Sequence, residues 1–354
     1  MGRLAVNKYF SFLFLVATFA VAGFTIFGLF GGNVTPAGNT ARAMLVYVLP
    51  LLIALNIMTL LVWLIRRRWH WAAIPFVTLL CCIPYSMTIL KFGSAAAESS
   101  DAQAGVKIAT YNVARFGRET TGFIAQDILA EMKRQKVEVL CLQEYNDVSG
   151  DRHNSESYKE YFPYIAKGVD DMIIFSRYPI KESKTIKFEM TNNSAQWADI
   201  DAHGKVFRVY NVHLETTGLN RTIHKAAKMA MQGFQVEESR LLRAIYGNYT
   251  MGMIVRAGQA EQLAQDIRES KRPVIVCGDF NDVPYSYVYN TMKGQLVDGF
   301  KECGHGWMYT FRGGKSKTVR IDYIFHDKSM KGVDYYKYDL TYSDHFPVFM
   351  KLEI

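Results

Sequence analysis

Acidic, amide and histidine side chains stand at the ends of several strand-like segments of this 354-residue chain. Asn112 ends the segment KIATYN, and Glu144 ends VLCLQE. The other such residues are Asn211 and His213 in FRVYNVHL, Asp279, Asn281 and Asp282 in VIVCGDFND, Asp322 in RIDYIF, and Asp344 and His345 in SDHF. Ligands of open α/β sheets bind beyond strand ends, so these side chains are expected to share one cleft.

The metal chemistry that this group favours is that of a hard divalent cation. Glu144, Asn112 and Asp344 offer the oxygen ligands that Mg²⁺ or Mn²⁺ prefers. The sequence has no Cys/His set with zinc spacing, no GxxxxGK[ST] loop for a nucleotide and no GxSxG elbow. Taken singly, Asn112 or Asp279 could end a turn and Glu144 could cap a helix, so only the group indicates a site.

Short apolar runs alternate with amphipathic segments from Val106 onward. About 250 residues of this kind can bury one large core, which predicts a single α/β or α+β layered domain. Helices are predicted at 123–135 and 257–269. Strands are predicted at 106–113, 137–142, 172–176, 197–201, 206–213, 273–277, 319–325 and 346–352.

The stretch 221–246 is rich in Met and Ala and has helical periodicity. Ile223, Ala227, Ala230 and Phe234 recur at the spacing of one helix face. A helix packed on the core is the plain interpretation, and a lid or membrane-surface helix above the site is the alternative.

Three apolar runs, 9–30, 43–65 and 71–90, precede this domain, and none contains a charged residue. Each is close to the roughly 20 residues that cross a bilayer. The helices of a soluble bundle would show charged residues every turn or so. Residues 1–92 are therefore predicted to be a membrane anchor with about three transmembrane helices.

The basic residues of the anchor predict its orientation. Arg3 and Lys8 precede the first run, and Arg66–Arg68 separate the second from the third, so both groups should be cytoplasmic. Three spans then place residues 106–354, beyond the small and polar linker 93–105, outside the cytoplasm of an inner or plasma membrane protein. Cleavage of the first run as a signal at Ala41-Arg42-Ala43 is the alternative, and it leaves the orientation unchanged.

The net charge of +8 belongs almost wholly to the anchor. Residues 1–97 contain seven of the 41 Lys and Arg residues and none of the 33 Asp and Glu residues, so the remainder is nearly neutral. A basic chain often binds nucleic acid, but here the excess charge is typical of membrane-topology signals.

The chain from Val106 to Ile354 resembles the endonuclease/exonuclease/phosphatase, or DNase I-like, superfamily. The resemblance rests on segments in the family's order: TYNV (110–113), LQE (142–144), IIFSRYPI (173–180), NVHL (211–214), GDFND (278–282), RIDYIF (320–325) and SDHFPV (343–348). It implies a four-layer sandwich, with two central β-sheets flanked by helices, and a metal-dependent phosphoesterase.

The resemblance also implies a role for each residue. Glu144 would be the principal metal ligand, with Asn112 and Asp344 completing or orienting the metal site. The catalytic set would be His345 as general base or proton shuttle, Asp322 orienting it, Asp279 positioning or deprotonating water, and His213 and Asn281 bonding phosphate oxygens.

Three functions are compatible with these features. The first is a membrane-tethered phosphodiesterase acting on a lipid headgroup or another small phosphoester, with the lipid bilayer as its partner. The second is an anchored nuclease, for which the scattered residues Arg115, Arg118, Arg312, Lys315 and Lys317 would contact phosphates. The third is a scaffold without catalysis, which would predict losses among Glu144, Asp279 and His345, and all three are present.

Overall fold

The structure is a computed structural model that describes residues 3–93, 105–114, 125–145, 158–169, 171–189, 191–217, 228, 231–232, 237–312 and 319–354. It divides into two compact units, Met1–Met87 with Val283–Asn290, and Thr88–Asp282 with Thr291–Ile354. The segment from Thr88 onward thus groups with the second unit, whereas the sequence predicted the anchor to extend to residue 92. Most of the predicted linker, 94–104, lies outside the described residues.

The first unit is helical. Its elements are α1 (Arg3–Leu29), η1 (Gly31–Asn33), α2 (Thr40–Met44), η2 (Leu45–Val48), α3 (Leu49–Ile65) and α4 (Trp69–Ser86). Both α3 and α4 pack against α1 and against each other. Two buried hydrogen bonds join α1 to α3: Trp63 Nε1 donates to Thr18 Oγ1 at 3.0 Å, and Asn56 Nδ2 donates to Thr25 Oγ1 at 2.7 Å. Such bonds satisfy polar groups among apolar helices.

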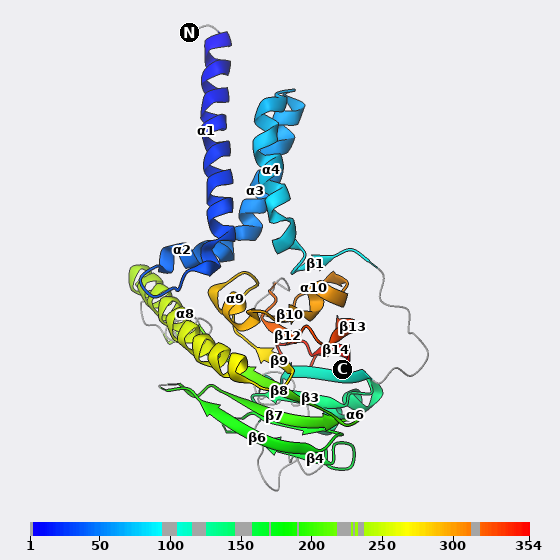
Figure 1. Cartoon of the computed structure of the whole chain (residues 1–354). Coiled ribbons are helices and arrows are strands. Elements are labelled where there is room, and N and C mark those ends of the chain that lie inside the picture. The colour runs from blue at the N-terminus through cyan, green and yellow to red at the C-terminus, as the bar shows by residue number, and fades with distance from the viewer. Residues whose placement is uncertain are drawn as a thin grey trace. The chain divides into compact units, whose positions relative to one another are not determined.

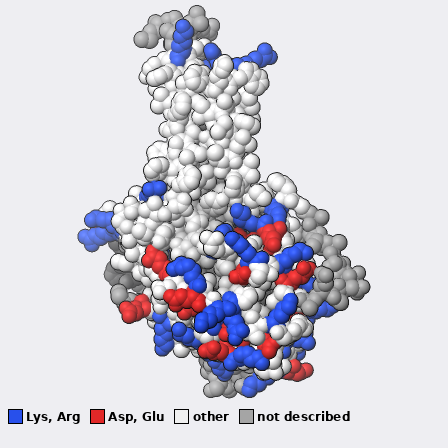
Figure 2. Space-filling view, viewed as in Figure 1, with Lys and Arg blue, Asp and Glu red and all other residues white. Residues whose placement is uncertain are grey.

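Two stretches of this unit, Val6–Asn33 and Thr40–Ile65, are long and apolar enough to cross a membrane. Only 28% of each apolar window is buried, whereas the core helix of a soluble protein would be mostly covered. Figure 2 shows a mostly white column with Lys and Arg atoms near its ends on the face drawn. The third predicted span, α4, is not one of the two stretches, and the orientation in a membrane stays a prediction.

The second unit contains two large mixed sheets (Figure 1). Their strand orders among the described residues are β10-β12-β9-β8-β7-β6 and β13-β14-β2-β3-β5-β4. The pairs β2–β3 and β8–β9 are parallel, and the other neighbours are antiparallel. The bounds are β2 (Gly105–Asn112), β3 (Val139–Gln143), β4 (Tyr164–Lys167), β5 (Ile173–Ser176), β6 (Ile180–Lys187), β7 (Ser194–Ala202), β8 (Lys205–His213), β9 (Val274–Asp279), β10 (Val297–Asp298), β12 (Asp322–His326), β13 (Lys331–Lys337) and β14 (Val348–Glu353).

The sheets stack face to face, which confirms the predicted sandwich of two sheets flanked by helices. Alternate residues of one strand point to different layers: Val106 and Ile108 pack between the sheets, whereas Ala109 and Tyr111 pack under α6 (Ala125–Arg134). On the other sheet, Tyr210 of β8 donates its hydroxyl to the Asp266 carboxylate of α8 (Glu238–Glu269) at 2.6 Å. The shorter helices are α9 (Tyr287–Lys293) and α10 (Gly299–Cys303).

The strands that the sequence predicted are the interior strands of the two sheets. Within these two sheets the sequence missed four strands, β4, β6, β10 and β13, and they are the four edge strands. Interior strands are covered on both faces and read as apolar runs, whereas β6 (IKESKTIK) exposes most of its residues. Edge strands commonly carry charges that block pairing with other chains.

The predicted helix 257–269 is the second half of α8, which begins at Glu238. No side chain of α8 before Gly252 is buried. This half of the helix therefore needs no apolar face, and the helix was predicted only where such a face exists. Of the predicted helix 221–246, most residues before 237 lie outside the described residues.

Gly278 of β9 is a position where both the backbone conformation and the space exclude a side chain. Its φ is +136°, and a Cβ would lie 2.0 Å from the Val212 carbonyl oxygen of β8. Gly278→Ala is therefore expected to lower the free energy of unfolding by about 3 kcal/mol, measured by urea unfolding of the full chain.

Gly258 provides the matched control, because it is a helical glycine of α8 with open space around its Cα. Gly258→Ala should leave stability unchanged or raise it by up to about 1 kcal/mol. Equal stability of the two variants would contradict the close approach of β8 and β9.

Candidate active site

The ends of the parallel pairs β2–β3 and β8–β9 bring four predicted residues together across the two sheets. Asn112 Nδ2 donates to Glu144 Oε1 at 3.2 Å and to Asp279 Oδ2 at 3.1 Å. His213 Nε2 lies 3.8 Å from Glu144 Oε1 and 3.9 Å from Asp279 Oδ2. Asn112 and Glu144 end one sheet and His213 and Asp279 end the other, so the site forms only when the sandwich is assembled.

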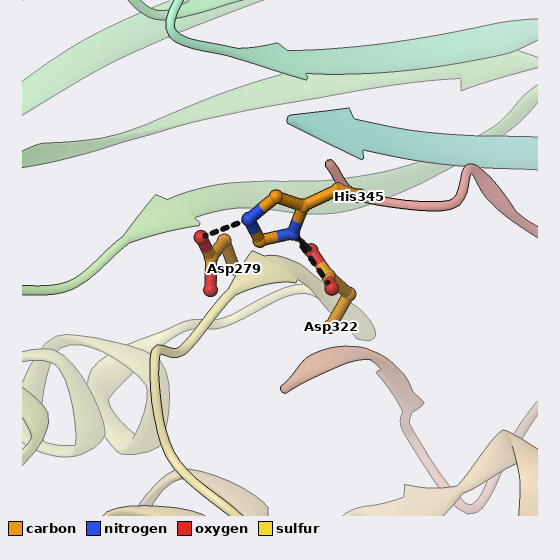
Figure 3. Close-up of side chains that lie close together, drawn as sticks. All are labelled: Asp279, Asp322 and His345. Carbon is orange, nitrogen blue, oxygen red and sulfur yellow. Dashed lines mark hydrogen bonds and ion pairs between the residues drawn. The ribbon is translucent and has the colours of Figure 1, made fainter. Parts of the chain in front are cut away.

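His345 lies between two carboxylates (Figure 3). Its Nδ1 is 3.0 and 3.1 Å from the two oxygens of Asp322, and its Nε2 is 3.6 Å from Asp279 Oδ2. Asp322 opens β12 and is the cross-strand partner of Asp279 on β9. All three side chains are buried. The pairing of β9 with β12 thus sets the spacing between the two carboxylates that hold the ring.

Asp322, His345 and Asp279 form a row with the imidazole in the middle, and the charges of its members depend on one another. Burial raises the pKa of Asp279 to about 6, against the opposing effect of His345. Burial also disfavours the charged form of His345, but the carboxylates of Asp322 and Asp279 outweigh it and raise the pKa of the imidazole to about 10. At neutral pH the row therefore holds an imidazolium between carboxylates, with Asp279 mostly ionised.

The turn Ser343–His345 joins the site through the serine. Ser343 Oγ donates to the Asn112 carbonyl at 2.8 Å and accepts from the His345 amide at 3.1 Å. Asp344 is exposed, and its Oδ1 is 3.3 Å from Ser343 Oγ. Among the described residues no hydrogen bond or ion pair joins Asp344 to Glu144, so the structure places Asp344 at the rim of the group.

Two site residues have left-handed backbone conformations, Glu144 at φ +53° and Asn281 at φ +52°. Such conformations are uncommon in non-glycine residues and occur where surrounding structure holds them. The Asn281 amide donates to Asp279 Oδ1 at 2.8 Å, and its side-chain nitrogen donates to the Leu214 carbonyl at 2.9 Å. Asn281 thus lies beside Asp279 and fixes the orientation of that carboxylate.

Two sets of donors are available to a metal ion. Ligand atoms of Asp279, Asp322 and His345 all lie within 4.8 Å of one another. The hydrogen bond from His345 Nδ1 to Asp322 already accounts for that closeness. The side chain of Glu144 is 33% exposed, and no Lys or Arg pairs with it within the described part of the chain. A partly exposed carboxylate beside Asn112, with no Lys or Arg partner among the described residues, fits a hard divalent cation better than the buried row does.

The sequence assigned no role to a buried amide pair behind the site. Gln143 Nε2 donates to Asn211 Oδ1 at 2.6 Å, and Asn211 Nδ2 donates to the Leu142 carbonyl at 3.0 Å. Both side chains are fully buried, so the pair ties the end of β3 to β8 next to Glu144 and His213. A Gln and an Asn inside otherwise apolar strands are the signal that could have found it.

Phe311 was also missed. Its ring lies 4.9 Å from the His345 ring, centroid to centroid, and its backbone forms a β-bridge with His345. It lies in an irregular segment, and sequence periodicity does not identify such a neighbour.

Of the five basic residues considered for nucleic acid binding, the structure describes only Arg312. Arg312 donates to Asp339 Oδ1 at 2.6 Å, and its guanidinium lies 3.8 Å from the centre of the Phe346 ring. It therefore has structural partners. Arg115, Arg118, Lys315 and Lys317 lie outside the described residues.

Two family models match this chain. One, described as the Endonuclease/Exonuclease/phosphatase family, matches residues 109–345, and the other, described as a domain of unknown function, matches residues 11–89. No protein of curated function matches the chain in sequence.

Solved structures share the fold. The endonuclease/exonuclease/phosphatase from Bacteroides vulgatus is 18% identical, with 71% of this chain and 100% of that chain covered and a TM-score of 0.50. The protein of the same description from Beutenbergia cavernae DSM 12333 is 18% identical, with 71% and 72% covered and a TM-score of 0.51. Humanized TDP2 of D. rerio is 17% identical, with 71% and 100% covered and a TM-score of 0.51.

Proposed function

Because the chain belongs to the endonuclease/exonuclease/phosphatase family, we propose that it is a divalent-metal-dependent phosphodiesterase that cleaves a lipid headgroup or another small phosphoester at a membrane. Phosphoester hydrolysis is the activity that the family and the site support together. The observation that carries the proposal is the row Asp322–His345–Asp279 beside the open Glu144 carboxylate.

Asp279 and His345 have different tasks in the proposed reaction. Asp279, ionised above a pKa of about 6, accepts a proton from the attacking water. His345, protonated below a pKa of about 10, stabilises the negative charge that builds on the phosphoryl oxygens. Asp322 bonds to Nδ1 and so turns Nε2 toward Asp279. His213, next to both Glu144 and Asp279, is placed to contact the same oxygens.

Glu144 would be the principal ligand of Mg²⁺ or Mn²⁺, with Asn112 orienting its carboxylate and Asp344 approaching from the rim. A bound divalent cation would polarise the phosphoryl group and stabilise the leaving oxygen. Asn281 would bind phosphate oxygens, as the sequence predicted, from its position beside Asp279.

A bell-shaped pH profile of kcat/KM is expected from this division. Activity should rise with pH as Asp279 loses its proton near a pKa of about 6, and fall as His345 loses its proton near a pKa of about 10. The profile is measured at saturating Mg²⁺ with a chromogenic phosphodiester. Activity that stays constant through the lower of these values would rule out Asp279 as the proton acceptor.

The membrane substrate is favoured by two observations. Only 28% of the apolar window of each candidate span in the first unit is buried, and Lys, Arg, Asp and Glu are intermixed on the second unit in the face drawn in Figure 2. Nucleic acid binding gains affinity from gathered positive charge. An anchored nuclease is the second candidate function.

The test is hydrolysis by the purified full chain with Mg²⁺ or Mn²⁺. The substrates are sphingomyelin-like lipids, phosphatidylinositols, a chromogenic phosphodiester and plasmid DNA. Cleavage of a lipid with little cleavage of DNA is expected, and cleavage of DNA alone would establish the nuclease instead. A reporter fused after Lys91 tests the side of the membrane, and a cytoplasmic signal would overturn the extracytoplasmic placement.

A further inference from the structure

We propose that a two-stranded ribbon, β1 (Leu90–Lys91) with β11 (Gly306–Trp307), rests in the headgroup layer of the bilayer and holds the catalytic unit against it. The proposal rests on the membrane part of the function proposed above. It does not depend on which phosphoester is cut.

The ribbon gathers exposed apolar side chains. Leu90 and Trp307 are cross-strand partners, so their side chains share one face of the ribbon. Leu90 is 38% exposed, Trp307 is 55% exposed, and Phe92, which follows β1, is 89% exposed. Tryptophan and other aromatic residues are enriched where the hydrocarbon core meets the headgroups. This face therefore has the composition of an interfacial anchor.

The opposite side of the ribbon is fastened to the catalytic unit. Lys91 Nζ donates to the Lys301 carbonyl at 2.8 Å and also to the Glu302 carbonyl. The Met308 amide donates to the Ile89 carbonyl at 2.7 Å. These bonds make β1 part of the catalytic unit rather than the start of a flexible linker.

A buried arginine extends the attachment toward the site. Arg320 donates to the Thr88 carbonyl at 2.9 Å and to both carboxylate oxygens of Asp298, at 2.9 and 2.7 Å. Arg320 and Asp298 are buried, and Arg320 stands two residues before Asp322. Arg320 thus joins the segment before the ribbon to the segment that leads into β12, the strand of Asp322.

Chain connectivity brings the ribbon to the bilayer. The helix α4 ends at Ser86, and the four residues from there to Leu90 reach ~14 Å at most. The headgroup layer is about 5–8 Å thick on each side. The helix packs against α1 and α3, which belong to the two candidate spans, and exposes Phe76, Leu80 and Ile83. If α4 lies among them in the membrane, the ribbon must lie at or near the interface.

Another exposed apolar set does not support the same conclusion. Leu242, Tyr246 and Met251 of α8 are exposed, but they are far in sequence from the membrane helices. No covalent connection of a few residues sets their distance from a bilayer.

The test is the depth of single fluorescent labels in the full chain, reconstituted in phosphatidylcholine vesicles without substrate. Labels are attached at Trp307→Cys and Phe92→Cys, in a background in which Cys81 and Cys303, the free cysteines that are not buried, are replaced by Ser. Tyr164→Cys on the edge strand β4 is the matched control, because Tyr164 is also an exposed aromatic residue. Nitroxides near the headgroups should quench the ribbon labels severalfold more than the control label.

Equal quenching at the three positions would overturn the proposal. Protection of the ribbon labels that rises with protein concentration, without quenching by lipid nitroxides, would also overturn it, because a second copy would then cover the ribbon. Phe92→Cys keeps the test valid if Trp307→Cys fails to fold, since Phe92 is almost fully exposed. The readout needs no catalysis, so an inactive enzyme with quenched labels would leave the ribbon standing while the proposed function fails.

Discussion

Replacing His345 with Ala is expected to lower kcat by about a thousandfold, because one preorganised group that stabilises charge in the transition state contributes about 10²–10³-fold. The imidazole is the only group that contacts both Asp322 and Asp279 through its two nitrogens among the described residues. Without it, the two buried carboxylates face each other without a positive charge between them. The pKa of Asp279 should then rise further, and less of it would be ionised at neutral pH.

The measurement is kcat and KM on a chromogenic phosphodiester at saturating Mg²⁺. His203→Ala is the control, since His203 is an exposed histidine in the turn between β7 and β8 and contacts Tyr178 rather than the site. Its activity should match that of the parent chain. Full activity of a folded His345→Ala variant would show that the row Asp322–His345–Asp279 takes no part in the reaction.

The interior of the fold could be predicted from the sequence because both faces of its strands are buried. Strand β3 (VLCLQ) is covered on each side, so its apolar run marks it without reference to any partner. The edge strand β13 (KGVDYYK) pairs with one strand, β14, and carries charged residues, so its strand character comes from that pairing. Local composition does not contain that information.

In the candidate site, too, some residues could be identified from the local sequence and others could not. The residues at strand ends were identifiable, because a polar residue after an apolar run is visible locally. Their partners were not, since the Gln143–Asn211 bond joins two strands 68 residues apart in the chain. The same holds for Thr88, whose carbonyl meets Arg320 across 232 residues. A residue that acts through a distant contact needs the assembled sandwich to be recognised.

Replacing Glu144 with Gln is expected to lower kcat/KM by about 10²–10³-fold and to raise the Mg²⁺ concentration needed for half-maximal activity. The substitution keeps the shape of the side chain and removes its negative charge. Glu144 Oε1 accepts from Asn112, and an amide oxygen can still accept that bond. The loss therefore reports on charge at the metal site rather than on packing.

Glu182→Gln on the exposed strand β6 is the matched control and should leave both values unchanged. Cation titrations of the two variants with Mg²⁺ and Mn²⁺ separate the possible roles of Glu144. If Glu144 binds the metal, its loss shifts the titration midpoint. If it acts only through His213, 3.8 Å away, activity falls without such a shift. An unshifted midpoint would move the metal toward the buried Asp279–Asp322–His345 set, where Asp279→Asn should then produce the shift.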